Sequence, residues 1–408
     1  IFLAFNVDIA KELVKRGING FTFNSFCNKT TAKHFRYPKL EKNKLYMICD
    51  DKLSDHDSEL YQSFIVKLVD LGRQLGIGTH LLPDTQDNWL NIVDQYCMEL
   101  ESKDADIYRA LELASKLLEM SNSMCYQVID FTDQIYQIVK CRLTVEQFPW
   151  VLVDEGQDTN IIQRYVLQQM LGPNSRLAVF GDPCQAIYAF RGADSESIPA
   201  MQREFNCKEL PLTISYRCPQ AVVKYAQQWV SHIQASPFAP EGEVLALPKW
   251  DSKDFQPSDM VLCRTTEPLE KLAYTMLRKH QACYVKGQDI GRGLKAVIKR
   301  VGGKDIDSLR DRLDTWAKRE MEKATAKKDD AKAQSIEDKA ACIHALIDGL
   351  SEDNRTVADL VNVIDSMFKD KAVGVVTLST IHRAKGLESP RVYWLNSSQC
   401  PSKWARTE

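Results

Sequence analysis

Short apolar runs recur along the chain, and each ends in polar or acidic residues. The clearest are residues 150–153, 177–180, 260–263, 373–377 and 392–395. Continuous apolar runs of this length predict buried strands of a mostly parallel sheet. Helix-spaced apolar positions lie between them, as in residues 161–170 and 219–230. Because strands alternate with helices, we expect an α/β architecture that binds ligands at the carboxyl ends of its strands.

Two stretches interrupt this alternation. Residues from about 30 to 125 carry apolar positions at helical spacing and no strong strand pattern. These positions include Phe64, Leu68, Leu71, Ile107, Leu111, Ala114 and Leu118. Residues from about 300 to 368 are also helical in pattern, and their charge run at 318–339 is typical of a solvated helix face. We therefore expect two α/β domains, 1–206 and 207–408, each with a helical insertion.

Composition narrows the class of protein. A chain of 408 residues exceeds one ordinary core, and its 44% hydrophobic and 26% charged residues are typical of globular proteins. The apolar runs are too short for a membrane helix, and Ile1–Phe5 lacks the basic start of a signal peptide. Twelve cysteines without a Cys-x-x-Cys pair, and seven histidines without zinc spacing, favour free thiols in a reducing compartment. The net charge of −2 implies that any nucleic-acid site is a local groove.

The strongest chemical signal follows the apolar run at 151–153. Residues 154–159 read Asp-Glu-Gly-Gln-Asp-Thr, so a strand would deliver Asp154 and Glu155 at its tip. In a nucleotide-hydrolysing site the first carboxylate holds Mg²⁺, and the second orients and deprotonates the attacking water. Adjacent carboxylates alone are common on loops, but the extended pattern after a hydrophobic strand is far more specific.

A second strand leads into a polar loop at residues 181–193. Gln185 is placed there to sense a phosphate. Tyr188 and Phe190 offer flat faces for stacked bases, and Arg191 can add a cation–π or phosphate contact. The alternative interpretation is that both aromatic residues belong to a core.

Together these two blocks resemble motifs II and III of UvrD/Rep-type superfamily 1 DNA helicases, in their order and in their spacing. Further segments resemble other elements of that family: motif Ia at 3–13, a short Asp-Phe element at 129–133, motif IV at 212–217, a second-domain strand at 261–265 and motif V at 380–388. The resemblance extends from residue 1 to about 396, with gaps at the two insertions. It implies two RecA-like parallel-sheet motor domains.

The resemblance also implies roles for residues at the nucleotide. Asp154 would hold Mg²⁺ and Glu155 would be the catalytic base. Gln185 would contact the γ-phosphate of ATP and couple it to DNA through Arg191. Arg217 would reach the same phosphate from the second domain, where a guanidinium stabilises charge on the transferring phosphoryl group.

The remaining site residues follow from motifs Ia, III and V. Glu388 would bond the ribose of ATP, with Gly386 beside it in the same motif. The expected DNA contacts are Phe5, Tyr188, Phe190, Arg191, Thr380 and His382. A purely structural role is the alternative for each residue taken alone, above all for His382.

The chain departs from the family pattern in several places. It contains no phosphate-binding loop of the form G-x-x-x-x-G-K-[ST], opens at motif Ia and stops about where motif VI would follow. We therefore expect a fragment shortened at both ends, which by itself hydrolyses little ATP. Gly156 stands where Ala or Phe is usual, a change that we interpret as tolerated. Asn24 replaces a usual His, which puts its DNA contact in doubt, and Phe190 replaces a frequent Trp.

The leading hypothesis is an ATP-driven translocase that moves 3′→5′ on single-stranded DNA and unwinds duplex junctions, with ATP and Mg²⁺ as cofactors. One alternative is a non-hydrolysing DNA-binding protein on a degenerate helicase core. Others are an ATPase subunit of a recombination nuclease complex and an RNA helicase. The expected location is the cytoplasm or nucleoid of a bacterial or phage-infected cell, without secretion or a membrane partner. The sequence indicates no protein partner and no pathway.

Overall fold

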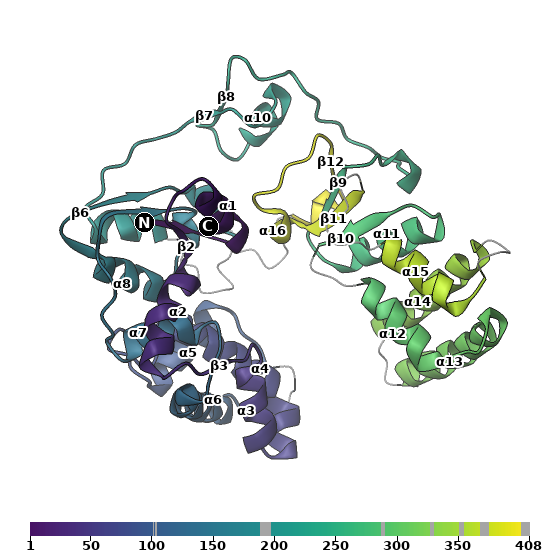
Figure 1. Ribbon diagram of the computed structural model, residues 1–408, viewed down its shortest axis with the longest axis horizontal. Coiled ribbons are helices and arrows are strands. Elements are labelled where there is room, and N and C mark those ends of the chain that lie inside the picture. The colour runs from purple at the N-terminus through teal and green to yellow at the C-terminus, as the bar shows by residue number, and fades with distance from the viewer. Residues whose placement is uncertain are drawn as a thin grey trace. The chain divides into compact units, whose positions relative to one another are not determined.

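The computed structural model describes residues 1–100, 102, 104–187, 197–286, 290–326, 330–350, 355–367 and 375–400. The chain forms two compact units, Ile1–Val244 (unit 1) and Leu245–Glu408 (unit 2), and each is described by itself (Figure 1). The domain limits expected from the sequence, 1–206 and 207–408, stay a prediction. None of the helices within the described ranges combines the length and the apolar character that a membrane-spanning helix requires. None of the twelve cysteines, which all lie within the described residues, forms a disulfide.

The sheet of unit 1 has four parallel strands in the order β2-β1-β5-β6. Their bounds are β1 Phe2–Ala4, β2 Gly20–Thr22, β5 Phe148–Val153 and β6 Leu171–Val179. Both predicted strands are confirmed in position. However, β6 begins well before the apolar run at 177–180 and ends one residue earlier, at Val179.

Helices connect these strands and cover the sheet. They are α1 Val7–Lys15, α2 Phe23–His34, α7 Asp133–Lys140, α8 Ile161–Met170 and α9 Ser197–Glu204. Helix α8 has the predicted bounds because Asn160 caps it, accepting a hydrogen bond from the backbone N–H of Gln163 at 3.0 Å. Its residues Val166 and Leu167 pack in the same buried core as Leu3 of β1.

The predicted insertion of unit 1 is helical, as expected. Its helices are α3 Lys44–Lys52, α4 Asp55–Gln74, α5 Gln86–Gln95 and α6 Ile107–Ser123. In Figure 1 they gather below the sheet, with α2 and α7 between. Phe64, Leu68 and Leu71 are buried in the core that the insertion shares with the sheet. Two short parallel strands, β3 Lys39–Leu40 and β4 Val128–Ile129, pair where the chain enters and leaves the insertion.

A small substructure follows α9. Two parallel strands, β7 Ile214–Ser215 and β8 Gln234–Ala235, flank helix α10 Gln220–Ala226. The helix is shorter than the pattern at 219–230 predicts. It ends where the Gln227 side chain donates to the backbone carbonyl of Ile233 at 2.8 Å, which turns the chain toward β8.

Unit 2 contains a second parallel sheet, in the order β10-β11-β9-β12. Its strands are β9 Met260–Cys263, β10 Cys283–Val285, β11 Val376–Thr380 and β12 Val392–Trp394. The predicted strands at 260–263 and 392–395 are confirmed, the second to within one residue. The predicted run at 373–377 begins outside the described residues, and β11 continues to Thr380.

The helices of unit 2 are α11 Glu267–Arg278, α12 Ile290–Val301, α13 Ile306–Ala326, α14 Asp330–Asp348 and α15 Val357–Met367. Leu313 of α13, Leu346 of α14 and Leu360 of α15 are buried in one core. These helices occupy the stretch for which the sequence predicts a helical insertion. The molecule is a mixed α/β protein with parallel sheets, as a RecA-like fold requires.

Candidate functional site

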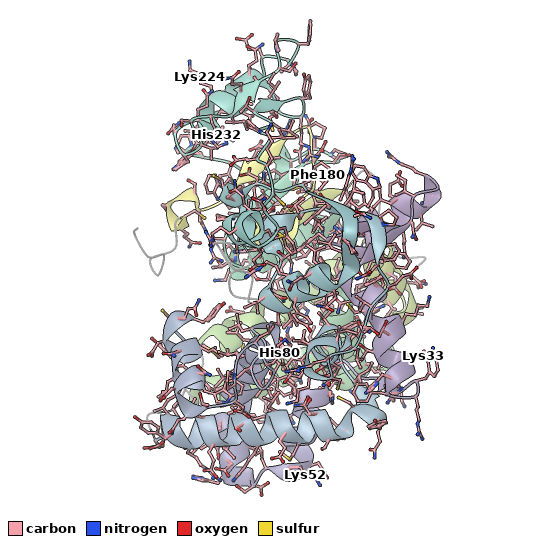
Figure 2. All side chains as sticks on the ribbon, turned by 90° about the vertical axis from the view of Figure 1, so that its left-hand side faces the viewer. Lys33, Lys52, His80, Phe180, Lys224 and His232 are labelled. Atoms are coloured by element: carbon pink, nitrogen blue, oxygen red, sulfur yellow. The ribbon has the colours of Figure 1, made fainter. Side chains whose placement is uncertain are left out.

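Three strands of unit 1 end side by side at the carboxyl edge of the sheet. Leu3 of β1 pairs with Val153 of β5, and Val153 pairs with Val179 of β6. The next residues continue this pairing, because the backbone N–H of Asp154 donates to Leu3 O at 2.9 Å and that of Phe180 donates to Val153 O at 2.8 Å. Phe180 is half-exposed at this edge (Figure 2). The edge therefore gathers the ends of the segments that resemble motifs Ia, II and III.

The two predicted carboxylates lie at the tip of β5. Asp154 and Glu155 are half-buried. Glu155 adopts the left-handed backbone conformation, with φ 52° and ψ 46°. A residue with a side chain pays a strain energy in this region, and such residues cluster at functional sites. The turn is fixed where the backbone N–H of Gly156 donates to Phe180 O at 2.8 Å.

Two glycines let this turn approach β6 closely. A Cβ atom at Gly156 would lie 2.3 Å from Val179 Cγ1, and one at Gly181 would lie 2.5 Å from Gln157 Oε1. Real Cβ contacts are not this short, so a side chain at either position would displace its neighbour. Glycine at position 156 is therefore required by the packing of this chain rather than merely tolerated.

Gln157 links the two motifs. Its buried side chain donates from Nε2 to a carboxylate oxygen of Glu155 and accepts at Oε1 from the backbone N–H of Asp182 at 3.0 Å. Asp182 in turn accepts at Oδ2 from Gln185 Nε2 at 2.8 Å, and at Oδ1 from the Cys184 backbone N–H at 2.9 Å. A continuous path of hydrogen bonds thus runs from Glu155 to Gln185, and it brings together two of the predicted catalytic residues.

The donor set at this edge fits magnesium in one particular way. Among the described residues, no group of three or more His, Cys, Asp or Glu side chains could cage a metal ion. Mg²⁺ is usually bound by one or two carboxylates together with substrate phosphates and water. Asp154, a half-buried carboxylate at a strand tip, fits that mode of binding.

The other predicted residues of unit 1 divide into two groups. Phe5 follows β1 at the same edge, and its side chain is 38% exposed. Arg217 is exposed in the loop between β7 and α10, and its contact with a phosphate stays a prediction. Tyr188, Phe190 and Arg191 lie outside the described residues.

Four predicted residues of unit 2 lie at the end of β11 or in the segment that follows it. Thr380 ends this strand and caps helix α16 Ile381–Ala384, accepting at Oγ1 from the Arg383 backbone N–H at 3.4 Å. His382 is half-buried within α16. Gly386 follows with φ 81°, a conformation that favours glycine, and Glu388 is exposed just beyond it.

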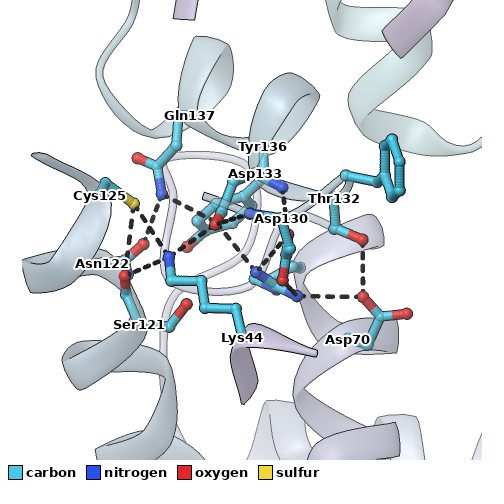
Figure 3. Close-up of polar contacts among 12 residues, drawn as sticks. Lys44, Asp70, Ser121, Asn122, Cys125, Asp130, Thr132, Asp133, Tyr136 and Gln137 are labelled. Atoms are coloured by element: carbon cyan, nitrogen blue, oxygen red, sulfur yellow. Dashed lines mark hydrogen bonds and ion pairs between the residues drawn. The ribbon is translucent and has the colours of Figure 1, made fainter. Parts of the chain in front are cut away.

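A buried ionic cluster lies where the helical insertion meets α7 (Figure 3). Arg73 of α4 contacts Asp130 (Nη2 to Oδ2, 2.8 Å) and Asp133 (Nη1 to Oδ1, 3.0 Å). Lys44 of α3 contacts Asp133 Oδ2 at 2.7 Å. Asp70 completes the group, with its Oδ1 3.2 Å from Arg73 Nη2. Four residues of the cluster are buried: Arg73, Lys44, Asp130 and Asp133. Attraction between opposite charges therefore holds this part of the core together.

The charges in the cluster shift one another's pKa values. Burial opposes ionisation of Asp133, but Arg73 and Lys44 outweigh it and hold the pKa of this carboxyl below its usual range. Burial raises the pKa of Asp130, although Arg73 acts against it. Burial likewise raises the pKa of the neighbouring Cys125 thiol to about 12.

Comparison with known proteins identifies the first half of the chain. A family model described as the UvrD/REP helicase N-terminal domain matches residues 7–206. Residues 7–206 of this chain belong to the UvrD/Rep-type helicase family. The matched residues include Asp154 and Glu155, the Gln157 link and the buried ionic cluster.

Curated relatives carry helicase names. The chain is 25% identical over 256 residues to a "Probable DNA helicase II homolog" of Mycoplasma pneumoniae, covering 58% of this chain and 34% of that protein. It is 31% identical over 105 residues to the "Putative ATP-dependent DNA helicase YjcD" of Bacillus subtilis, covering 26% and 13%. It is 26% identical over 113 residues to "DNA helicase II" of Haemophilus influenzae, covering 26% and 16%. The chain spans about a third or less of the length of these relatives.

The structure also shows polar and aromatic contacts that sequence reasoning missed. Asn24, whose DNA contact was in doubt, donates from Nδ2 to the backbone carbonyl of Phe131 at 2.7 Å. The Phe131 side chain is 45% exposed, and Lys42 Nζ lies 5.9 Å from the ring centroid. The signal for Phe131 was its place inside the Asp-Phe element. Nothing in the sequence pattern pointed to Arg73 or Lys44 as partners of the flanking Asp130 and Asp133.

Proposed function

We propose that the protein is an ATP-dependent DNA helicase that translocates 3′→5′ along single-stranded DNA and unwinds duplex junctions. The observation that carries the proposal is the path of hydrogen bonds from Glu155 through Gln157 and Asp182 to Gln185. It joins a candidate base to a candidate phosphate sensor at one sheet edge. The helicase names of the relatives support DNA as the substrate.

Each residue of this edge has a proposed task in hydrolysis. Asp154 would hold Mg²⁺, which would neutralise negative charge on the phosphate oxygens of ATP. Glu155, oriented by Gln157, accepts a proton from the attacking water. Gln185 contacts the γ-phosphate, and Arg217 stabilises the charge that develops on it. Glu388 would bond the ribose of ATP, with Gly386 beside it in the same motif.

Exposed aromatic rings provide the proposed path for the DNA strand. Phe5 and Phe131 are both partly exposed in unit 1, and stacking of a base on an aromatic ring tolerates any base sequence. Tyr188, Phe190 and Arg191 continue this role in the segment after Gln185. Thr380 and His382 are the proposed contacts in unit 2.

The test uses the full-length protein and Glu155→Gln. We expect ATP hydrolysis stimulated by single-stranded DNA, and unwinding of duplexes with a 3′ overhang only. Glu155→Gln should reduce turnover by roughly 10²- to 10⁴-fold and leave ATP binding intact. The matched control is Glu146→Gln, the same change at an exposed residue of the loop before β5. Unwinding restricted to 5′ overhangs would refute the polarity, and unchanged turnover in Glu155→Gln would refute the assignment of the base.

A further inference from the structure

We infer that Arg73 is a positioning residue: the ionic cluster that it centres holds Phe131 in the orientation that stacks on a nucleic-acid base. The inference rests on the proposed function, because it takes single-stranded nucleic acid as the ligand of Phe131. It assigns a role in nucleic-acid binding to the helical insertion, through side chains that never touch the ligand.

The turn that carries Phe131 is closed on itself by two reciprocal hydrogen bonds. The backbone N–H of Asp133 donates to Asp130 Oδ1 at 2.8 Å, and that of Asp130 donates to Asp133 Oδ2 at 3.0 Å. Each carboxylate thus caps the backbone of the other. The pair fixes the backbone on both sides of Phe131.

The insertion then holds this turn from outside. Arg73 spans both carboxylates with its two terminal nitrogens, and Lys44 holds the second oxygen of Asp133. Thr132 Oγ1 donates to Asp70 Oδ1 at 2.7 Å, and Asp70 also contacts Arg73. The side chains of Asp130, Thr132 and Asp133 are therefore all engaged with helices α3 and α4.

Phe131 behaves differently from its three neighbours in the turn. Phe131 is 45% exposed, although burial of a Phe side chain typically stabilises a protein. Its carbonyl is fixed by Asn24 at the start of α2. The turn thus holds the backbone of Phe131 tightly and leaves an apolar face toward solvent, which is the arrangement of a preorganised binding residue.

A role in stability alone does not account for the cluster. Buried ion pairs stabilise little more than well-packed apolar side chains of similar size, because desolvation offsets most of the attraction between the charges. What a guanidinium adds is geometry, since its planar fork fixes two carboxylates in direction as well as in distance. Lysine at position 73 would keep the charge and lose that fork.

The test is a double-mutant cycle on DNA binding. The chain is titrated with an oligothymidylate that contains 2-aminopurine, whose fluorescence reports stacking. Phe131→Ala should weaken binding about 5- to 100-fold, as expected for the loss of one base stack, and should abolish the stacking signal. Arg73→Lys should weaken binding at least fivefold. In the Phe131→Ala background, Arg73→Lys should have no further effect, because Arg73 acts through that ring.

Two further variants keep the outcome clear. Arg109→Lys is the matched control, because Arg109 also joins two carboxylates, Asp57 and Glu112, but on the surface of the insertion. It should bind DNA as the unaltered chain does. Thr132→Val removes only the hydrogen bond to Asp70. It replaces Arg73→Lys as the test variant if Arg73→Lys does not fold. It should weaken binding by the same mechanism, and again only when Phe131 is present.

Several results would overturn the inference. One is that the losses of DNA affinity caused by Phe131→Ala and Arg73→Lys add up in the double variant. Another is that a folded Arg73→Lys binds DNA as the unaltered chain does. A third is that Arg109→Lys weakens DNA binding as much as Arg73→Lys. Unchanged binding in Phe131→Ala would overturn it while the helicase proposal stands, since Glu155→Gln and overhang polarity test that proposal separately. Coupled losses without ATP-driven unwinding would support the inference and refute the proposed function.

Discussion

The side chain of Gln157 accepts a hydrogen bond from the backbone N–H of Asp182 at 3.0 Å and donates one to the Glu155 carboxylate. It therefore joins the ends of two neighbouring strands through one buried amide. Removing it would change both the base and the loop that carries Gln185. This relationship leads to the first prediction.

We expect Gln157→Leu to lower both stability and turnover. The backbone N–H of Asp182 would lose its buried partner, which costs about 1–3 kcal/mol, and Glu155 would lose its orienting donor. Thermal unfolding and DNA-stimulated ATP hydrolysis measure the two effects. Gln168→Leu, at an exposed position of α8, is the control. A stable Gln157→Leu with unaltered turnover would contradict the proposed link.

Gly156→Ala should destabilise unit 1 by about 1–3 kcal/mol, because the added methyl group would overlap Val179 Cγ1. Val179→Ala would remove the overlapping methyl group. The double variant should therefore lose less stability than the sum of the losses in the two single variants. Gly293→Ala is the control, since its Cβ would have open space within α12. That change should leave stability equal or slightly higher. Urea unfolding measures all four variants, and an undamaged Gly156→Ala would contradict the packing argument.

Ionisation of Asp133 and ionisation of Asp130 should change the free energy of unfolding in opposite directions. The pKa of Asp133 is lowered in the folded state, so its ionisation favours folding above the usual carboxyl range. This contribution is lost as the pH falls through the lowered pKa. The pKa of Asp130 is raised, so its ionisation opposes folding as the pH increases.

Asp133→Asn should therefore lower the free energy of unfolding at pH 7 by about 3–5 kcal/mol, the usual cost of breaking a buried pair. The difference from the unaltered chain should shrink toward pH 3. Asp130→Asn should cost less at pH 7. Urea unfolding at several pH values between 3 and 7 checks both variants. A deficit in Asp133→Asn that is independent of pH would contradict the assignment.

Arg217→Ala should reduce ATP turnover by roughly 10³-fold or more, while ATP binding changes little. A guanidinium that stabilises charge during phosphoryl transfer acts mainly on the rate. Single-turnover hydrolysis and nucleotide-binding titrations of the full-length protein separate the two quantities. Arg203→Ala in α9 is a suitable control. Equal losses in rate and binding would mean that Arg217 is structural.

The sequence predicts the regular parts of this fold well. Strand β9 and helix α8 have their predicted bounds, because apolar runs and the Asn160 cap mark them locally. The beginning of β6 was missed because it contains Gly172 and Pro173, which are unfavourable in strands, and its register with β5 shifts there. Its pairing depends on the neighbouring strand rather than on its own residues.

In the candidate site, too, some residues are marked by a local sequence pattern and others are brought together only by the fold. The placement of Asp154, Glu155 and Gln185 just after strand ends was predictable because a strand and the polar residues that follow it are adjacent in the sequence. Lys44 and Arg73 were not, because isolated charged residues on helices are usually exposed. Only the fold brings them to Asp130 and Asp133, from which they are separated by 57 to 89 positions in the chain.

The ionic cluster has a consequence for how this protein can be recombined. Lys44 and Arg73 belong to the insertion, whereas Asp130 and Asp133 lie on the segment that returns to the sheet. An insertion exchanged at residue 125 would separate these cations from their carboxylates and leave unpaired charge in the core, which costs several kcal/mol. The unit that can be transplanted between relatives therefore extends through Lys140, and natural or designed chimeras should respect that boundary.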